Sequence, residues 1–105
     1  MEFKTTNSVA LGVPDRRSAV EFYVGTLGFQ YVKEGSNWIE LSTGALRLFI
    51  CDDDVKEPVF DIAVEDVGAA TERLVSRGCV RVDLNADETY VRDPFGYLFC
   101  ISPIS

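Results

Sequence analysis

The stretch "YVRDPFGYLFCIS", residues 90–102, joins a tight turn to an alternating strand. In Asp93-Pro94-Phe95-Gly96 the proline fixes one backbone angle, the glycine admits a left-handed angle, and the aspartate can cap the turn. Apolar and small side chains then alternate along residues 97–102, as is typical of a strand. Alternation predicts that Phe99 and Ile101 share one face and that Cys100 and Ser102 share the other.

This ending is the second copy of a pattern that begins earlier in the chain. Val13-Pro14-Asp15 matches Val64-Glu65-Asp66 at an offset of 51, and Gly44-Ala45-Leu46 matches Gly96-Tyr97-Leu98 at an offset of 52. Asp15 and Asp66 can each cap a helix that a glycine ends, at Gly28 and at Gly78. The internal repeat predicts a βαβββ unit written twice.

The repeat predicts an α+β fold in a single domain covering residues 1–105. We expect a first module at about 7–51, an acidic linker at 52–58 and a second module at about 59–103. One helix and a small sheet cannot bury both sheet faces, so two modules are expected to pair. The result would be a curved mixed sheet with the helices outside and a concave cup inside, where ligands bind.

Composition narrows the classes of function. The chain of 105 residues has a net charge of −7, which disfavours nucleic acid and anionic membrane and favours a cationic ligand. No apolar run approaches the roughly 18 residues of a membrane helix, and the start of the chain lacks the features of a signal peptide. We therefore expect a cytoplasmic protein. Cys51, Cys79 and Cys100 suit free thiols, and the absence of histidine removes the commonest general base and metal ligand.

Two local motifs, together with the repeat, resemble a known superfamily. The first motif runs from Val13-Pro14-Asp15 through Phe22-Tyr23 to Leu27-Gly28-Phe29, and the second is Arg92-Asp93-Pro94-Phe95-Gly96-Tyr97. They resemble the vicinal oxygen chelate superfamily, which includes glyoxalase I, extradiol dioxygenases, fosfomycin-resistance enzymes and bleomycin-resistance proteins. The resemblance covers nearly the whole chain and implies the two-module fold, and it also implies a homodimer.

The resemblance further implies four inward-facing positions at which metal-using relatives carry His, Gln or Glu. In this chain they fall on Ser8, Leu48, Val59 and Cys100. A catalytic divalent metal needs about three protein ligands, so we expect neither a metal nor another cofactor here. Cys100 is either a nucleophile or soft-metal ligand, or a small apolar filler of the cup. We favour the filler, because a reactive cysteine needs a nearby cation or base.

Strand alternation also places Trp38, Glu40 and Asp61 in the cup, with Tyr90 and Arg92 close by. Trp38 could instead belong to the core, and Glu40 could lie on a solvated face. Asp61 could act as a general base or pair with Arg47 or Arg92. The full set of expected ligand-binding residues is Ser8, Trp38, Glu40, Leu48, Val59, Asp61, Tyr90, Arg92 and Cys100.

A wall of small, aromatic and acidic residues suits a planar molecule that carries an amine. Such a wall also resembles that of the bleomycin-resistance proteins, and the resemblance implies a metal-free small-molecule binding protein of that type, which would sequester a cationic or aromatic ligand such as an antibiotic and would have no catalytic residues. One alternative is a metal-independent lyase or isomerase with Asp61 or Glu40 as acid or base. Another is a non-catalytic interaction module whose own side chains fill the cup.

Overall fold

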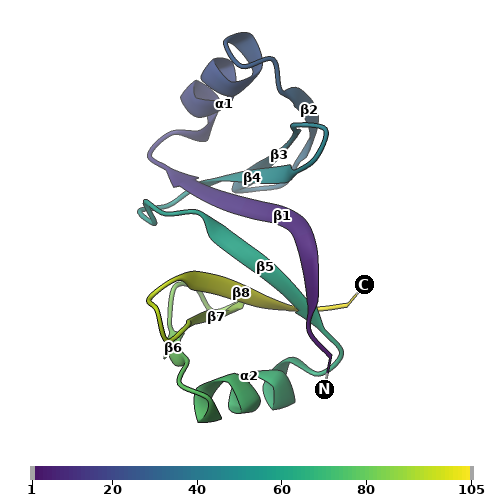
Figure 1. Cartoon of the computed structure of the whole chain (residues 1–105). Helices are drawn as coiled ribbons and strands as arrows, with labels where there is room; N and C mark the ends of the chain where they lie inside the picture. The colour runs from purple at the N-terminus through teal and green to yellow at the C-terminus, as the bar shows by residue number, and fades with distance from the viewer. Residues whose placement is uncertain (1, 105) are drawn as a thin grey trace. The chain divides into compact units, whose positions relative to one another are not determined.

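The computed structural model describes residues 2–104, which form two compact units (Figure 1). The first unit is Asn7–Pro58, and the second unit contains residues 2–6 together with 59–104. Residues 52–58, the expected linker, belong to the first unit. Within the described residues, neither helix is long and apolar enough to cross a membrane.

The first unit consists of β1 (Lys4–Val13), α1 (Arg16–Gly25), β2 (Gln30–Glu34), β3 (Trp38–Ser42) and β4 (Arg47–Asp52), with the first residues of β1 counted in the second unit. Its strands lie in the order β2-β3-β4-β1. β1 runs parallel to β4, whereas the β2–β3 and β3–β4 pairs are antiparallel.

The second unit repeats this arrangement with β5 (Val59–Val64), α2 (Val67–Ser76), β6 (Val80–Val82), β7 (Thr89–Arg92) and β8 (Leu98–Pro103). Its strands lie in the order β5-β8-β7-β6, with β5 parallel to β8 and the other pairs antiparallel. Each unit is therefore a βαβββ module with a mixed sheet, and the predicted α+β fold class is confirmed.

Both helices begin at the predicted aspartates. The Asp15 carboxylate accepts from the Arg17 backbone N–H at 3.0 Å, and the Asp66 carboxylate accepts from the Ala69 backbone N–H at 3.0 Å. These contacts satisfy amide groups that the first helical turn leaves without an intrahelical acceptor. A glycine with positive φ follows each helix: Gly78 (107°) directly follows the C-cap of α2, as the sequence predicts, whereas Gly28 (78°) lies three residues after α1 has ended at Gly25.

Each unit has its own apolar core between its helix and one face of its sheet. In the first unit the buried strand residues pack with residues of α1, and in the second they pack with residues of α2. The core members are Ile39, Leu41, Leu48 and Ile50 in the first unit and Val64, Ala70, Cys79, Val91 and Ile101 in the second. Burial of a side chain of this size stabilises the fold by about 2 kcal/mol.

The alternation inferred from the sequence is confirmed for the strands that build these cores. Val9, Leu11 and Val13 pack on the helix side of the first unit, and Ile62, Val64 and Phe99 pack on the helix side of the second. We call the opposite side of each sheet its helix-free face. The alternating partners of the core residues lie on that face, and they include most of the predicted site residues.

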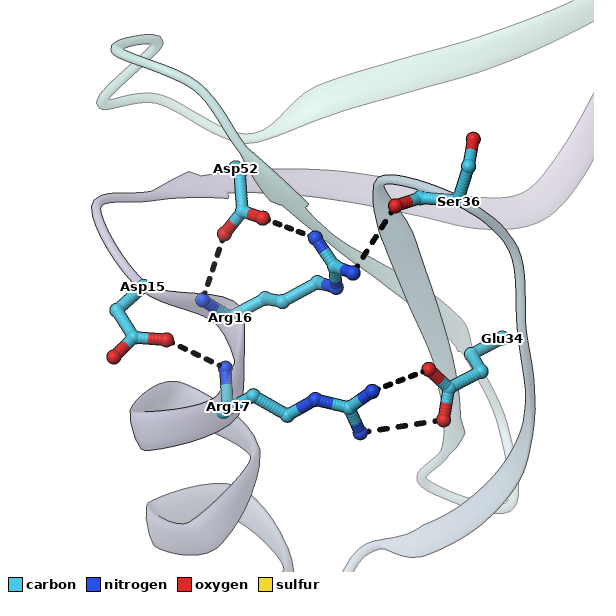
Figure 2. Close-up of polar contacts among 6 residues, drawn as sticks. All are labelled: Asp15, Arg16, Arg17, Glu34, Ser36 and Asp52. Carbon is cyan, nitrogen blue, oxygen red and sulfur yellow. Dashed lines mark hydrogen bonds and ion pairs between the residues drawn. The ribbon is translucent and has the colours of Figure 1, made fainter.

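The N-terminus of α1 is fixed to the strands of the first unit by two arginines (Figure 2). The Arg16 guanidinium forms an ion pair with Asp52 and donates to the Ser36 carbonyl at 3.1 Å, while Arg17 donates to both carboxylate oxygens of Glu34. Asp52 is the last residue of β4. Its ion pair with Arg16 joins it to the start of α1, so it is not part of a solvated linker.

Candidate functional site

The register of the parallel strands corrects one of the four expected metal-ligand positions. β4 begins at Arg47 and β8 begins at Leu98, an offset of 51 (98 − 47), so the residue equivalent to Cys100 is Phe49 rather than Leu48. Leu48 pairs with Val9 and is buried in the core on the helix side. The prediction that Leu48 lines a ligand site is therefore wrong.

The physical reason for the error is a one-residue difference between two turns. The chain takes one residue more from Gly44 to the start of β4 than from Gly96 to the start of β8. Because side chains alternate between faces, a slip of one residue moves every side chain of the strand to the other face.

With this correction, the four superfamily positions carry Ser8, Phe49, Val59 and Cys100. Two of them present only hydrocarbon, and Val59 is buried as well. Among residues 2–104 no group of three or more His, Cys, Asp or Glu side chains is placed to share a metal ion. Since a catalytic divalent metal requires about three donors, the residues present do not fit one at these positions.

The helix-free face of the second unit carries a polar row across three strands. Strand register places Asp61 of β5 beside Cys100 of β8, and Cys100 beside Tyr90 of β7. The Asp61 carboxylate accepts from the Ser102 hydroxyl at 2.7 Å and from the Thr6 hydroxyl at 3.2 Å. These hydroxyls hold the Asp61 carboxylate in a fixed orientation.

Glu88 completes this row, although the sequence analysis did not single it out. Its carboxylate accepts from the Tyr90 hydroxyl at 2.6 Å, and the Cys100 sulfur lies 3.9 Å from the same oxygen. The Asn85 side-chain amide donates to the Tyr90 hydroxyl at 3.0 Å. Glu88 lies two residues before Tyr90, so strand alternation extended back beyond the start of β7 could have identified it. We call Asp61, Glu88, Tyr90 and Cys100 the acidic row.

The acidic row keeps its thiol and phenol in their neutral forms. Burial, followed by the negative charges of Glu88 and Asp61, raises the pKa of the Cys100 thiol to about 12. Burial and the hydrogen bond to Glu88 also raise the pKa of Tyr90. Because only the thiolate is nucleophilic, Cys100 is not activated for covalent chemistry.

The helix-free face of the first unit carries an ion pair between the buried Glu40 and the partly exposed Arg47. The Arg47 Nε and Nη2 groups donate to the two carboxylate oxygens of Glu40 at 3.0 and 3.2 Å. Glu40 is 4% exposed, so it does not lie on a solvated face. These hydrogen bonds lower the pKa of Glu40. Glu40 is therefore ionised with its charge already matched, which does not suit the roles of acid, base or partner of a cationic ligand.

Aromatic rings adjoin this ion pair. The Arg47 guanidinium lies 5.2 Å from the centre of the Phe49 ring, and Phe49 packs edge to face against Trp38 at 5.7 Å. Trp38 is half-buried and lies outside the core cluster, and its indole covers Gly35 so closely that a Cβ there would collide with the ring. Trp38 thus provides an aromatic surface on the helix-free face.

The structure divides the remaining predicted site residues between the units. Ser8 is half-buried and lies beside Arg47 in the β1–β4 register. Arg92 donates to the Gly96 carbonyl at 2.9 Å and so supports the turn before β8. The expected pairing of Asp61 with Arg47 or Arg92 stays a prediction.

A separate hollow of about 180 Å³ lies in the first unit and contains none of the predicted site residues. It is bordered by the end of β1, by Tyr23 of α1 and by residues 55–58. Its lining combines aliphatic side chains with the polar side chains of Tyr23, Lys56 and Glu57.

Comparisons with known proteins agree with this architecture. A family model described as a glyoxalase-like domain matches residues 8–102, whereas no curated protein matches the chain. A hypothetical protein from Bacillus halodurans C-125 superposes with a TM-score of 0.73 at 13% identity, over 100% of this chain and 96% of that one. A glyoxalase/bleomycin resistance protein/dioxygenase superfamily member from Vibrio splendidus 12B01 superposes with a TM-score of 0.65 at 16% identity, over 98% of both chains.

An enzyme of the same group is similar over a smaller share of its length. An extradiol ring-cleaving dioxygenase from B. fuscum superposes with a TM-score of 0.68 at 21% identity, over 99% of this chain but 33% of that one. Identities this low show a shared fold and carry no activity across. The family match covers most of the chain, and with the two βαβββ modules it shows that the protein belongs to the glyoxalase-like family of the vicinal oxygen chelate superfamily.

Proposed function

We propose that the protein binds a small organic cation reversibly and without a metal, as a sequestering protein of the bleomycin-resistance type would. The observation that carries this proposal is the acidic row. Asp61 and Glu88 come from different parts of the second unit, yet Asp61 lies beside Cys100 in the strand register and a Glu88 oxygen lies 3.9 Å from the Cys100 sulfur. Two carboxylates close to the partly buried Cys100 side chain create a negative electrostatic potential around it.

The chemistry of the row suits an ammonium or amidinium group. Each carboxylate already accepts hydrogen bonds from hydroxyl groups, which orient it without neutralising it. A ligand cation would add a positive charge next to these carboxylates through charge-assisted hydrogen bonds. The half-buried ring of Tyr90 adds an aromatic surface on which a cation can rest. The net charge of −7 would also speed the approach of a cation.

The donor set supports binding in preference to metal-dependent chemistry. Phe49 and Val59 offer no metal ligand, and the Cys100 thiol stays protonated near neutral pH. With Glu40 engaged by Arg47, the metal-independent enzyme alternative reduces to Asp61 as the acid or base. No contact described in the structure favours that alternative over reversible binding.

Calorimetric titration tests the proposal. We expect benzylamine and benzamidine to bind, whereas benzyl alcohol, which has a similar ring and no charge, does not. Asp61→Asn and Glu88→Gln should each weaken binding about tenfold, since each removes a charged acceptor. Glu72→Gln, on the exposed surface of α2, is the matched control for net charge and should leave the affinity unchanged. Equal binding of alcohol and amine, or equal losses in all three variants, would contradict the proposal.

A dimeric assembly is a separate proposal that follows from the family resemblance. Sedimentation equilibrium should give twice the 11.7 kDa mass of one chain. A monomer at all concentrations would remove the possibility that residues of two chains share one site.

A further inference from the structure

Arg47 differs from an ordinary surface arginine because both the plane and the position of its guanidinium are fixed. Glu40 receives two hydrogen bonds from it, at 3.0 and 3.2 Å, in the two-pronged geometry that sets the guanidinium plane. The ring of Phe49 supports the guanidinium at 5.2 Å. The Arg47 side chain is therefore ordered before any ligand arrives.

The two members of this ion pair are unequally exposed. The side chain of Arg47 is 46% exposed, while that of Glu40 is 5% exposed. The pair is neutral overall, but the end that it presents to solvent is the positive one. A flexible arginine loses rotamer freedom when it binds an anion, whereas an arginine that is already fixed loses little.

The neighbours of Arg47 indicate which anion would fit. Phe49 and Trp38 form an edge-to-face pair on the same helix-free face, and both rings are half-buried. Strand register places Ser8 and Ser42 on either side of Arg47, so the strand positions that flank it carry hydroxyl groups. Aromatic surface, hydroxyl groups and a fixed planar cation together match a ring that carries a carboxylate. A multiply charged anion is disfavoured by the net charge of −7.

We propose that the helix-free face of the first unit is a recognition site for an aromatic carboxylate, with Arg47 holding the carboxylate and the Trp38–Phe49 pair contacting the ring. This site goes beyond the proposed cation site, since it lies on the other unit and uses none of the acidic row. Its chemistry is that of a planar monoanion such as a substituted benzoate.

The competing interpretation is purely structural: the ion pair joins β3 to β4, and Arg47 has no ligand. The two interpretations differ in what lysine can replace. Lysine keeps the positive charge near Glu40, but it lacks the planar fork that binds a carboxylate with two parallel hydrogen bonds. Because the contact with Glu40 also uses the guanidinium fork, Arg47→Lys is judged together with a variant that leaves that contact in place.

Fluorescence of Trp38, the only tryptophan in the chain, reports binding at this face directly. We expect benzoate and 1-naphthoate to quench it saturably and benzyl alcohol and benzylamine to leave it unchanged. Arg47→Lys should weaken carboxylate binding about tenfold or more while the protein stays folded by circular dichroism. Arg17→Lys, which changes an exposed arginine that also pairs with a glutamate, is the matched control and should bind as the original protein does.

Phe49→Leu gives a second measure that keeps the ion pair. It removes the ring beneath the guanidinium, and we expect several-fold weaker binding of naphthoate. Equal quenching by benzoate and benzyl alcohol would overturn the proposal, and so would unchanged benzoate affinity in both Arg47→Lys and Phe49→Leu. Both variants retain Asp61 and Glu88, so they should still bind benzylamine. Loss of benzoate binding with benzylamine binding unchanged therefore tests this site separately from the proposed cation site.

Discussion

Replacing Arg47 by methionine is expected to destabilise the protein more than replacing Glu40 by glutamine, although both changes break the same ion pair. The reason is the unequal exposure of the two charges. Arg47→Met leaves a carboxylate that is 4% exposed without its cation. Glu40→Gln leaves a guanidinium that is almost half exposed and can be hydrated.

The expected magnitudes follow from that difference. Leaving one member of a buried pair without its partner costs about 3 kcal/mol. Losing one charge-assisted contact while the remaining charge reaches water costs about 1 kcal/mol, and the glutamine oxygen still accepts one hydrogen bond. The difference of about 2 kcal/mol corresponds to roughly 8 °C in melting temperature for a domain of this size.

The contribution of Glu40 to the free energy of unfolding should also change with pH in opposite directions in the original protein and in Arg47→Met. In the original protein the Arg47 hydrogen bonds lower the pKa of Glu40. Its stabilisation is therefore present above the unfolded-state pKa of about 4.3 and is lost as pH falls through the lower folded-state pKa. In Arg47→Met, burial without a cation raises that pKa instead. The variant should then lose stability as pH rises through the raised value, so its deficit should shrink from pH 7 to pH 5.

Urea denaturation followed by circular dichroism at pH 5 and pH 7 measures both effects. Arg17→Met and Glu34→Gln, which break the more exposed pair at the start of α1, are the controls and should cost less than Arg47→Met. The reasoning would be refuted if the Glu40 and Arg47 variants were equally unstable, or if the Arg47→Met deficit were the same at both pH values.

Other consequences of the structure can be measured separately. Because the pKa of Cys100 is raised to about 12, iodoacetamide at pH 8 should alkylate it far more slowly in the folded than in the unfolded chain. Glu88→Gln should speed alkylation of the folded protein, and mass spectrometry of the modified peptide measures both rates. Gly12→Ala should lower the free energy of unfolding by about 2 kcal/mol, since its methyl group would collide with the loop that follows β4. Gly25→Ala has open space around its Cβ and should leave the melting temperature unchanged or raise it. Asp66→Ala should lower the free energy of unfolding by about 1 kcal/mol, because α2 loses the acceptor for its first amides, and an unchanged urea midpoint would contradict this.

Features set by local chemistry could be predicted from the sequence. Asp15 and Asp66 cap the two helices because a carboxylate at that position accepts the amides of the first turn. Residues 59–64 could be assigned to two faces because Ile62 and Val64 alternate with Asp61, and only one face meets the helix. These inferences need only the periods of the helix and the strand.

Features set by contacts between distant residues could not be predicted. Glu40 was expected to be solvated or to meet a cationic ligand, but Arg47, seven residues away on the neighbouring strand, takes both of its oxygens. Leu48 was misplaced because the repeat gave an offset of 52 at the turn, while the strands themselves follow an offset of 51. Periodicity assigns a face, but register and turn length decide which residue occupies a given place on it.

The repeat reproduces the scaffold of each unit and not the chemistry that the scaffold carries. Strand register aligns two equivalent rows, Ala10-Phe49-Glu40 in the first unit and Asp61-Cys100-Tyr90 in the second. The carboxylate lies on the third strand of one row and on the first strand of the other. In the first row an arginine pairs with the carboxylate, and in the second row the hydroxyl groups of Ser102 and Thr6 donate to it. One duplicated framework therefore carries a guanidinium paired with a buried carboxylate on the helix-free face of one unit and carboxylates that accept from hydroxyl groups on that of the other, so each face needs its own ligand test.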